Sequence, residues 1–386
     1  MKRMFTGLLL AVMATGCSTF QQATSQVLPA KDTNPPKPLK EFRPTAKVGT
    51  LWQVSTGSGS GRDYVHINPF VDATMVAVGG GRLVSAWNKT NGARLWQTPI
   101  DEEVTGGVSG GEGSVFVGTG NGNAIALDSQ SGKVRWIQQL SSEVLAVSPP
   151  SNGIVVFRSS DGRLSGLSTQ SGEILWQQLR QSPVLSLRGA GTPILVGRMV
   201  IAGFDNGVVT AFDLQNGHAL WEVTLSIPRG SSDIDRIIDV DGKIKALGEA
   251  LFAASYNGQI AGINMRTGSI GWSAPYSSYA GVDADPNGLY TTSTNGDLWK
   301  LEPREGKPIW KMDDFERRQP TAPTLVGNYV VIGDKEGYLH WINTASGEMA
   351  ARIRGDNAGY TTSPVLDGNV IYAFGTSGVL SAFNSQ

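Results

Sequence analysis

Histidine, net charge and long apolar runs are all scarce in this sequence of 386 residues. Its three histidines, His66, His218 and His340, lie in different parts of the chain without a pair at metal-ligand spacing, so no histidine metal site is predicted. The 32 basic and 33 acidic residues nearly cancel, and such a balance attracts neither nucleic acid nor an anionic membrane face. No apolar run is long enough to span a bilayer.

Cysteine is the scarcest residue, with one copy near the start of the chain. Two basic residues, Lys2 and Arg3, and the short apolar stretch Leu8–Met13 precede it, an order typical of a signal peptide. A lone free thiol is a liability in the oxidising compartment that such a leader implies, whereas a thioether to lipid removes it. Residues 1–16 are therefore predicted to be a cleaved signal peptide and are left out of the fold.

The residues around Cys17 resemble a bacterial lipobox. Small residues precede the cysteine, although Ala14 stands where leucine is usual. The resemblance implies cleavage before Cys17 and its acylation, and several acyl chains together hold a protein firmly on a membrane. Ser18 stands where retention in the inner membrane usually needs Asp, so the resemblance implies an outer-membrane anchor. An ordinary signal peptide with an incidental cysteine is the alternative.

Residues 17–48 are predicted to form a tether that begins at the lipidated cysteine. Five prolines lie in this stretch among Gln, Thr, Lys and Ala. Such a composition buries no core, so the segment is expected to stay extended or disordered. Residues 49–386 are predicted to form one all-β domain, because they combine many glycines with short apolar runs.

Eight copies of one repeat make up this domain, at intervals mostly near 40 residues. Each complete copy has a β-branched run, a glycine tip, a strand of alternating pattern, a tight turn ending in glycine, and a last short strand. Four strands per unit at this period are typical of a propeller blade. The tips lie at Gly81, Gly122, Gly162, Gly207, Gly258, Gly296, Gly337 and Gly378. The turns end at Gly92, Gly132, Gly172, Gly217, Gly268, Gly306 and Gly347.

The last strand of most copies carries a tryptophan at one position. Ala351 takes that position once. Because these large aromatic side chains recur with the blades, they are predicted to pack between blades rather than to bind a cofactor. They are Trp96, Trp136, Trp176, Trp221, Trp272 and Trp310, joined by Trp52 near the N-terminal end of the domain.

The eighth copy is incomplete, since the chain ends at Gln386 before its last strand. The stretch Leu51–Val54, with Trp52, is a final strand without the rest of its repeat. We therefore expect this strand to pair into the C-terminal blade, which removes a free sheet edge. The predicted fold is an all-β, eight-bladed β-propeller of four-stranded blades, closed by its N-terminal strand. The alternative, seven blades plus fragments, leaves Trp52 unexplained.

The sequence lacks the settings in which catalytic residues usually stand. No G-x-S-x-G segment places a serine between a strand and a helix. The glycine-rich Gly118–Gly122 precedes a strand, so no helix N-terminus is available for a phosphate. One acidic cluster, Asp233, Asp235, Asp239 and Asp241, does not fit the twelve-residue calcium loop. A loop with solvated carboxylates is expected there, with a calcium site as the alternative.

Three copies share the pattern A-x-[DN]-x-x-x-G-x-x-x-W, at Ala86–Trp96, Ala126–Trp136 and Ala211–Trp221. This pattern resembles the tryptophan-docking repeat of pyrroloquinoline-quinone propellers, which two families carry. The quinoprotein dehydrogenases are longer, bind calcium beside a catalytic Asp and, where they oxidise alcohols, use an adjacent cysteine pair. This chain has one cysteine and no matching carboxylate set. It is similar along its length to the BamB family of outer-membrane assembly lipoproteins: lipobox, tether, eight repeats and no extra domain.

The resemblance to the BamB family implies a scaffold without enzymatic activity or cofactor. Such a protein is expected at the outer membrane, facing the periplasm and touching the membrane only through its lipid. The implied partners are the periplasmic domain of BamA, the other Bam subunits and unfolded outer-membrane proteins, whose delivery it would assist. An exposed edge strand could receive such substrates by β-augmentation. A quinone-dependent dehydrogenase-like propeller and a periplasmic propeller with a ligand in its channel are the alternatives.

Two connections between blades are longer than the others. The interval Trp136–Trp176 is 40 residues, whereas Trp176–Trp221 is 45 and Trp221–Trp272 is 51. Because strands alternate in direction, both extra stretches are expected on one face of neighbouring blades. Apolar residues beside Arg and Asp on such loops are typical of a binding surface with a charged rim. Two plain long loops are the alternative.

The resemblance assigns these connections to a partner. In the BamB family the segments L-S-L-R and D-V-D contact BamA. They match Leu185, Leu187, Arg188, Asp239 and Asp241 here, although the two residues that follow D-V-D depart from the family pattern.

Overall fold

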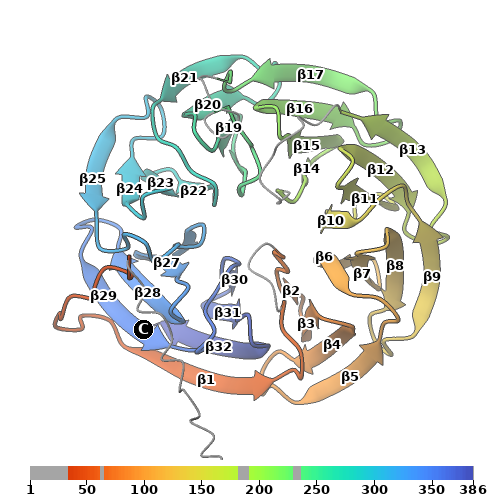
Figure 1. The fold of residues 1–386 in the computed structure, drawn as a ribbon, viewed down its shortest axis with the longest axis horizontal. Coiled ribbons are helices and arrows are strands. Elements are labelled where there is room, and N and C mark those ends of the chain that lie inside the picture. The colour runs from red at the N-terminus through yellow and green to blue at the C-terminus, as the bar shows by residue number, and fades with distance from the viewer. Residues whose placement is uncertain (1–33, 61–64, 181–190, 229–235, 386) are drawn as a thin grey trace, which may run out of the picture. The chain divides into compact units, whose positions relative to one another are not determined.

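The computed structural model describes residues 34–60, 65–180, 191–228 and 236–385. Across these ranges the regular structure consists of 32 strands in eight four-stranded sheets, which confirms the predicted all-β, eight-bladed propeller. The sheets stand side by side around a ring, each with one strand nearest the axis and one at the rim (Figure 1). The described ranges hold no helix with the length and apolarity that crossing a membrane takes.

Blades one to four follow one another along the chain. Blade one consists of β2 (Phe70–Val71), β3 (Met75–Gly80), β4 (Leu83–Asn88) and β5 (Arg94–Pro99). Blade two consists of β6 (Val104–Gly111), β7 (Ser114–Thr119), β8 (Asn123–Asp128) and β9 (Val134–Gln139). Blade three consists of β10 (Val144–Val147), β11 (Ile154–Ser159), β12 (Arg163–Ser168) and β13 (Ile174–Leu179). Blade four consists of β14 (Ile194–Val196), β15 (Met199–Gly203), β16 (Val208–Asp213) and β17 (Ala219–Thr224).

Blades five to seven repeat this order, and blade eight joins the two ends of the domain. Blade five consists of β18 (Lys245–Leu247), β19 (Ala250–Ala254), β20 (Ile260–Asn264) and β21 (Ile270–Ala274). Blade six consists of β22 (Val282–Asp285), β23 (Gly288–Thr292), β24 (Leu298–Leu301) and β25 (Pro308–Met312). Blade seven consists of β26 (Thr324–Val326), β27 (Tyr329–Gly333), β28 (Tyr338–Asn343) and β29 (Met349–Arg354). Blade eight consists of β30 (Val365–Asp367), β31 (Val370–Phe374), β32 (Val379–Ser385) and β1 (Val48–Ser55).

The chain enters the rim strand of blades one to seven through a similar tight turn, and blade two shows how the sequence makes it. The backbone N–H groups of Gln130 and Ser131 donate to Oδ1 of Asp128, at 3.2 and 2.9 Å. Gly132 ends the turn at a φ of 69°, which glycine adopts without strain. The pairing of β8 with β9 then shifts next to the tryptophan. The [DN]-x-x-x-G part of the repeat therefore encodes a turn and a bulge that set where the tryptophan stands.

Seven tryptophans join neighbouring blades near the rim. Each indole N–H donates to a backbone carbonyl in the glycine turn of the next blade, at 2.8–3.1 Å. The turn has no room for a side chain: a Cβ on Gly172 would lie 2.7 Å from the ring of Trp136. The seven are Trp52, Trp96, Trp136, Trp176, Trp221, Trp272 and Trp310.

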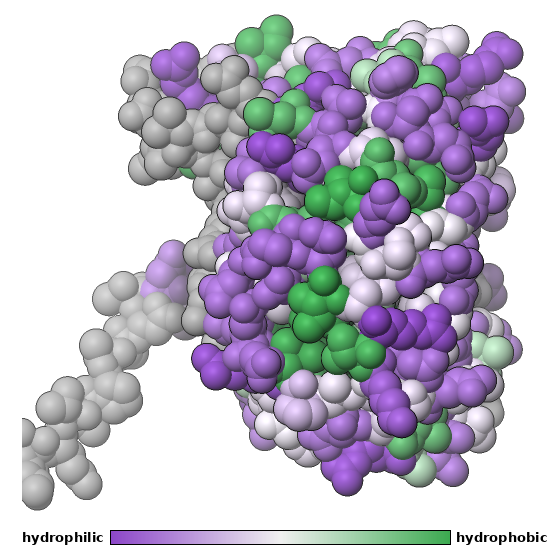
Figure 2. Space-filling model, turned by 90° about the vertical axis from the view of Figure 1, so that its right-hand side faces the viewer, coloured by the Kyte–Doolittle hydropathy of each residue, from purple (hydrophilic) through white to green (hydrophobic). Residues whose placement is uncertain are grey.

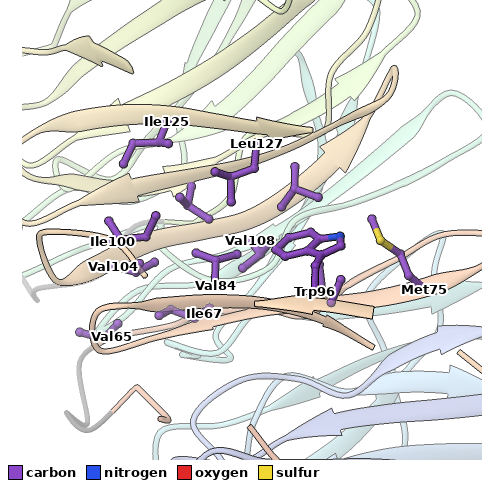
Figure 3. Packing of buried hydrophobic residues seen from close by; sticks show 14 residues of the cluster. Val65, Ile67, Met75, Val84, Trp96, Ile100, Val104, Val108, Ile125 and Leu127 are labelled. Carbon is purple, nitrogen blue, oxygen red and sulfur yellow. The ribbon is translucent and has the colours of Figure 1, made fainter. Parts of the chain in front are cut away.

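The apolar core lies between the blades. Figure 3 shows the seam of blades one and two, where Trp96 lies among side chains from both sheets, including Met75, Val84 and Val108. Comparable clusters fill the other seams. Because every such cluster draws on two blades, the packing that stabilises one blade also fixes its neighbour.

Blade eight confirms the predicted closure of the ring. β1 pairs antiparallel with β32, with Trp52 opposite Ala382. The N–H and the hydroxyl of Thr56 then both donate to the carbonyl oxygen of Gly378, each at 2.9 Å. Because β1 and β32 come from opposite ends of the domain, no covalent turn joins them.

The seam between blades seven and eight differs from the others. Ala351 stands at the tryptophan position of β29, opposite Trp341 in β28. The N–H groups of Thr45 and Ala46 both donate to the carbonyl oxygen of Ala350, at 2.9 and 3.2 Å. Ala46 is buried in the same apolar cluster as Trp341. A segment that precedes β1 therefore covers the outer edge of β29.

This covering segment extends upstream, and we call residues 37–46 the strap. The N–H of Lys37 donates to the carbonyl oxygen of Glu316 at 3.0 Å. Nη1 of Arg318 donates to the carbonyl oxygen of Lys37 at 3.1 Å, and Nη1 of Arg352 donates to that of Lys40 at 3.2 Å. Part of the stretch expected to behave as a tether thus has defined contacts with blade seven and with the connection that leads to it.

Candidate partner interface

The strands that flank the two lengthened connections end on one face of the ring. The first connection joins β13 to β14 and the second joins β17 to β18, so each links a rim strand of one blade to the innermost strand of the next. Given the alternating strand directions, these strand ends lie on the face that carries the hairpin tips. Leu185, Leu187 and Arg188 belong to the first connection and lie outside the described residues. Asp239 and Asp241 belong to the second connection and are described.

Asp241 is held by a buried arginine from another blade. Nη1 of Arg158, in β11 of blade three, lies 3.1 Å from Oδ1 of Asp241, and Nη2 lies 2.5 Å from Oδ1 of Asp205 in blade four. The Arg158 side chain is 2% exposed and its guanidinium lies 5.4 Å from the ring centroid of Phe204. One guanidinium therefore ties blade three to blade four and to the second connection.

Asp239 is buried as well, and the residue between the two carboxylates explains why. The N–H of Val240 donates to the carbonyl oxygen of Phe204 at 3.2 Å, and its side chain lies in the core between blades four and five. The carbonyl oxygen of Asp239 accepts from the N–H of Tyr256 at 2.8 Å. The sequence led us to expect solvated carboxylates here. The D-V-D segment is instead packed into the ring, because Val240 and its flanking peptide groups find partners there.

Asp205, Asp239 and Asp241 bring three carboxyl groups close to one another. Burial raises the pKa of the Asp241 carboxyl well above its usual range, and the neighbouring carboxyls of Asp205 and Asp239 act in the same direction. The positive charge of Arg158 opposes this shift. The carboxyl groups of Asp205 and Asp241 thus share one guanidinium, so the position of Asp241 in the second connection depends on Arg158.

The described part of the second connection also has an exposed apolar side chain. Ile227 follows β17 closely and is 67% exposed, the largest value among the bulky apolar side chains of the described ranges. It shares a connection, and hence a face, with Asp239 and Asp241. Ile227 was not among the site residues predicted from the sequence, although an isoleucine before Pro228 in a lengthened connection is a visible signal.

The described residues contain no group of three or more His, Cys, Asp or Glu side chains arranged to hold a metal. His340 is buried against Phe315, and its Nε2 lies 2.9 Å from Oδ2 of Asp334. Nε of Arg318 donates to the same oxygen at 2.7 Å. Asp334 therefore orients the arginine that binds the strap, and this cluster is part of the packing of blade seven.

Comparison with known proteins places the chain in a family. Residues 79–312 match the family model described as outer membrane protein assembly factor BamB. The chain is 38% identical over 377 residues to outer membrane protein assembly factor BamB of Pseudomonas aeruginosa, covering 97% of each protein. The crystal structure of BamB from Moraxella catarrhalis has a TM-score of 0.80 and 28% identity, covering 88% of this chain and 100% of that one.

The same fold occurs in an enzyme of low sequence similarity. A europium-containing methanol dehydrogenase has a TM-score of 0.72 at 14% identity, covering 87% of this chain and 93% of that chain. At this identity the likeness extends to the fold alone. The identity and coverage of the assembly factors are what decide the family, and the chain belongs to the family of outer membrane protein assembly factor BamB.

Proposed function

We propose that this protein is a non-enzymatic scaffold of the β-barrel assembly complex at the outer membrane. It is anchored through lipid on Cys17, faces the periplasm, docks on the periplasmic part of BamA and assists the delivery of outer-membrane proteins. Membership of the family carries the proposal, because the relatives that match nearly the whole chain are named outer membrane protein assembly factors. The other subunits of the complex are further partners.

The docking face is the one crossed by the two lengthened connections. Leu185, Leu187 and Ile227 supply apolar anchors of the kind that dominate protein interfaces, and Arg188 supplies a charge beside them. All four belong to neighbouring connections on one face, which supports a single continuous contact.

Asp239 and Asp241 have a positioning role in this proposal. Asp239 is buried, and Asp241, whose side chain is 10% exposed, is bound to Arg158 beneath the face. Their contribution to partner binding therefore passes through the second connection, whose path they fix. Asp241→Asn should change affinity less than Arg158→Met, because loss of the guanidinium leaves the carboxyl groups without their shared partner.

Binding of purified variants to the periplasmic domain of BamA tests the docking face. Leu187→Ala or Arg188→Ala should weaken binding about 30-fold, which corresponds to about 2 kcal/mol at 1.4 kcal/mol per decade. The melting temperature of these variants should not change, because a loop side chain contributes little to the ring. Lys133→Ala and Glu173→Ala, in exposed turns on the opposite face, are the matched controls. Normal binding by the loop variants together with failure of the controls would put the interface on the other face.

Fractionation tests the anchor separately. Cys17→Ser should leave the protein uncleaved or free of the outer membrane, because the acyl acceptor is gone. Mature protein that still sediments with the outer membrane would contradict lipid attachment at Cys17.

Calorimetry with pyrroloquinoline quinone and calcium separates the scaffold from the dehydrogenase alternative. We expect no saturable heat, since the chain has no adjacent cysteine pair. Tight binding together with dye-linked alcohol oxidation would favour the enzyme.

A further inference from the structure

Two arginines hold the backbone of the strap, which Figure 1 shows in red beside β29. Nη1 of Arg318 donates to the carbonyl oxygen of Lys37 at 3.1 Å. Nη1 of Arg352 donates to the carbonyl oxygen of Lys40 at 3.2 Å. The ring of Phe42 also covers the guanidinium of Arg352, with 5.0 Å between the guanidinium carbon and the ring centroid. The place of the strap therefore depends on where these two guanidinium groups stand.

Asp334 and His340, both buried, position the two arginines. Oδ2 of Asp334 accepts from Nε of Arg318 at 2.7 Å and lies 2.9 Å from Nε2 of His340. On the other side of the imidazole ring, Nε of Arg352 lies 3.3 Å from Nδ1 of His340. An arginine side chain can only donate, so Nδ1 is the acceptor and Nε2 carries the hydrogen of a neutral imidazole. Both arginines that bind the strap are thus attached to one carboxylate–imidazole pair.

A proton on Nδ1 of His340 is incompatible with this arrangement. It removes the acceptor for Arg352 and places a positive ring 3.3 Å from a positive guanidinium. The charged groups around the ring are Arg318 and Asp314 from the connection before blade seven, Asp334 from the turn after β27, Arg352 and Arg354 from β29, and Lys40 from the strap. Bases outnumber acids in this set, so a further positive charge pushes Arg352 away.

Burial keeps His340 neutral while the strap is closed. It lowers the pKa of His340 below the ordinary value of about 6.5, and the charges of Arg352 and Arg318 act in the same direction against that of Asp334. Release of the strap takes Phe42 off Arg352 and opens a path for water to Nδ1, so the pKa returns toward about 6.5. Closure is therefore most stable above about pH 6.5 and loses stability as the pH falls toward the lower pKa of the closed form.

The strap hides a part of the rim that other blades expose. Ala350, on β29 beneath the strap, is fully buried. At the same position, directly before the tryptophan, Leu175 of blade three and Leu220 of blade four are 46% and 51% exposed. Figure 2 looks at the side of the ring that carries β9 and β13 and shows apolar patches at the surface there. Release of the strap would give blade seven a similarly exposed rim.

We propose that the strap is a pH-sensitive switch, in which protonation of His340 releases residues 37–46 from blade seven. The chain then first joins the ring at Val48, where β1 begins, instead of at Lys37. The released segment adds at most about 33 Å of reach at about 3.3 Å per residue. With a lipid on Cys17, as in the proposed function, acid would let the ring work further from the membrane. The release itself does not depend on the lipid or on BamA, so its test is independent of the proposed function.

Hydrogen exchange of the full-length protein, measured by mass spectrometry, tests the release. The amide hydrogens of Thr45 and Ala46, bonded to the carbonyl oxygen of Ala350, report the closed strap. Their protection, corrected for the intrinsic pH dependence of exchange, should fall by about threefold to tenfold per pH unit below about pH 6.5, since one proton is taken up on release. The amide of Trp52 in β1 is the internal reference and should stay protected. Strap protection that does not change with pH would overturn the inference.

His340→Gln should abolish the pH dependence. Glutamine keeps an acceptor for Arg352 and a donor for Asp334 but takes up no proton in this range. His66→Gln and His218→Gln, at the two other histidines of the chain, are the matched controls and should respond to pH as the wild type does. A response that survives His340→Gln, or that either control loses, would contradict the assignment. Thermal melts by circular dichroism establish that each variant is folded.

A reciprocal measurement needs no substitution at His340. If proton uptake opens the strap, a looser strap must raise the pKa of His340 by the same linkage. Phe42→Ala removes the half-buried ring that covers Arg352 and should leave the propeller folded. Exchange of the imidazole C2 hydrogen, followed by mass spectrometry, gives the pKa of each histidine. We expect the pKa of His340 to rise toward about 6.5 in Phe42→Ala and that of His218 to stay unchanged. An unchanged pKa of His340 in a variant whose strap amides have lost protection would overturn the switch.

Discussion

Blade seven differs from the other blades in the strand that carries its tryptophan. In six blades a glycine or alanine lies opposite the rim tryptophan, as Ala126 lies opposite Trp136. In blade seven the order is reversed, with Trp341 in β28 opposite Ala351 in β29. The ring of Trp341 packs edge-on against Phe383 of blade eight, with centroids 6.1 Å apart. The tryptophan has moved one strand inward.

The reversal follows from the neighbour that blade seven must contact. A rim tryptophan donates its indole N–H to a glycine turn of the next blade, and blade eight has no such turn because β32 and β1 come from opposite ends of the domain. The strap fills the rim there instead, with Thr45 and Ala46 bound to the carbonyl oxygen of Ala350. The residue at a blade's rim is therefore set by the next blade as much as by its own strand.

Removal of the closing strand β1 should have the largest effect on stability. Deletion of the residues up to Val54 takes away the strap, Trp52 and the partner of β32, which then becomes an open edge. We expect a lower melting temperature by circular dichroism and aggregation by light scattering. A truncated protein as stable as the parent would rule out a role for β1 in closing the ring.

Truncation of a rim tryptophan to alanine should have the next largest effect on stability. Trp136→Ala should lower the free energy of unfolding by about 3–5 kcal/mol, because it leaves a cavity between blades two and three. Leu95→Ala, at an exposed rim position, is the control and should change it by less than about 0.5 kcal/mol. Chemical denaturation measures both. Similar losses in the two variants would mean that the seam does not depend on the tryptophan.

A tryptophan at the exceptional position tests the reversal directly. Ala351→Trp should destabilise the protein by about 1–3 kcal/mol, because Ala46 and Trp341 already fill this seam. Denaturation of the variant beside the wild type gives the value. Stabilisation would indicate that the seam between blades seven and eight is under-filled and that the strap leaves space for an aromatic ring.

The smallest expected effect is on the hydrogen bond of the indole N–H, which the rim tryptophan Trp136 makes and Trp341, among the described residues, does not. Trp136→Phe removes the indole N–H that donates to the carbonyl oxygen of Thr169 at 3.0 Å. The free energy of unfolding should fall by about 1–3 kcal/mol. Within the described part of the chain, Nε1 of Trp341 is buried without a hydrogen-bond partner. Trp341→Phe should therefore cost about 1 kcal/mol less than Trp136→Phe. The opposite order in denaturation would show that docking does not rely on this hydrogen bond.

The fold could be predicted because its causes are local and recur. An Asx turn such as that of Asp128, the glycine that ends it and the tryptophan that follows all lie within a short stretch, so the blade can be recognised from the sequence. Trp52 without its repeat and the truncated eighth copy predicted the closure for the same reason. The pattern did not reveal why Ala351 breaks it, because the answer depends on the absence of a turn in the neighbouring blade.

The contacts that sequence reasoning missed join residues far apart in the chain. Arg158 and Asp241 are 83 positions apart, and the strap bonds Arg318 and Arg352 across 281 and 312 positions. The composition of the strap is that of a disordered tether, and the D-V-D segment reads as a solvated loop. Long-range partners reverse both expectations. Arg158, which directly follows the apolar run of β11, is a local signal that could have indicated the buried cluster.

Photocrosslinking in living cells tests the central claim, that the face crossed by the two lengthened connections docks on BamA. A photoreactive amino acid in place of Ile227 probes that face, and one in place of Glu173 probes an exposed turn on the opposite face. The account predicts a crosslink to BamA from position 227 and none from position 173. A crosslink from position 173 with none from position 227 would contradict it.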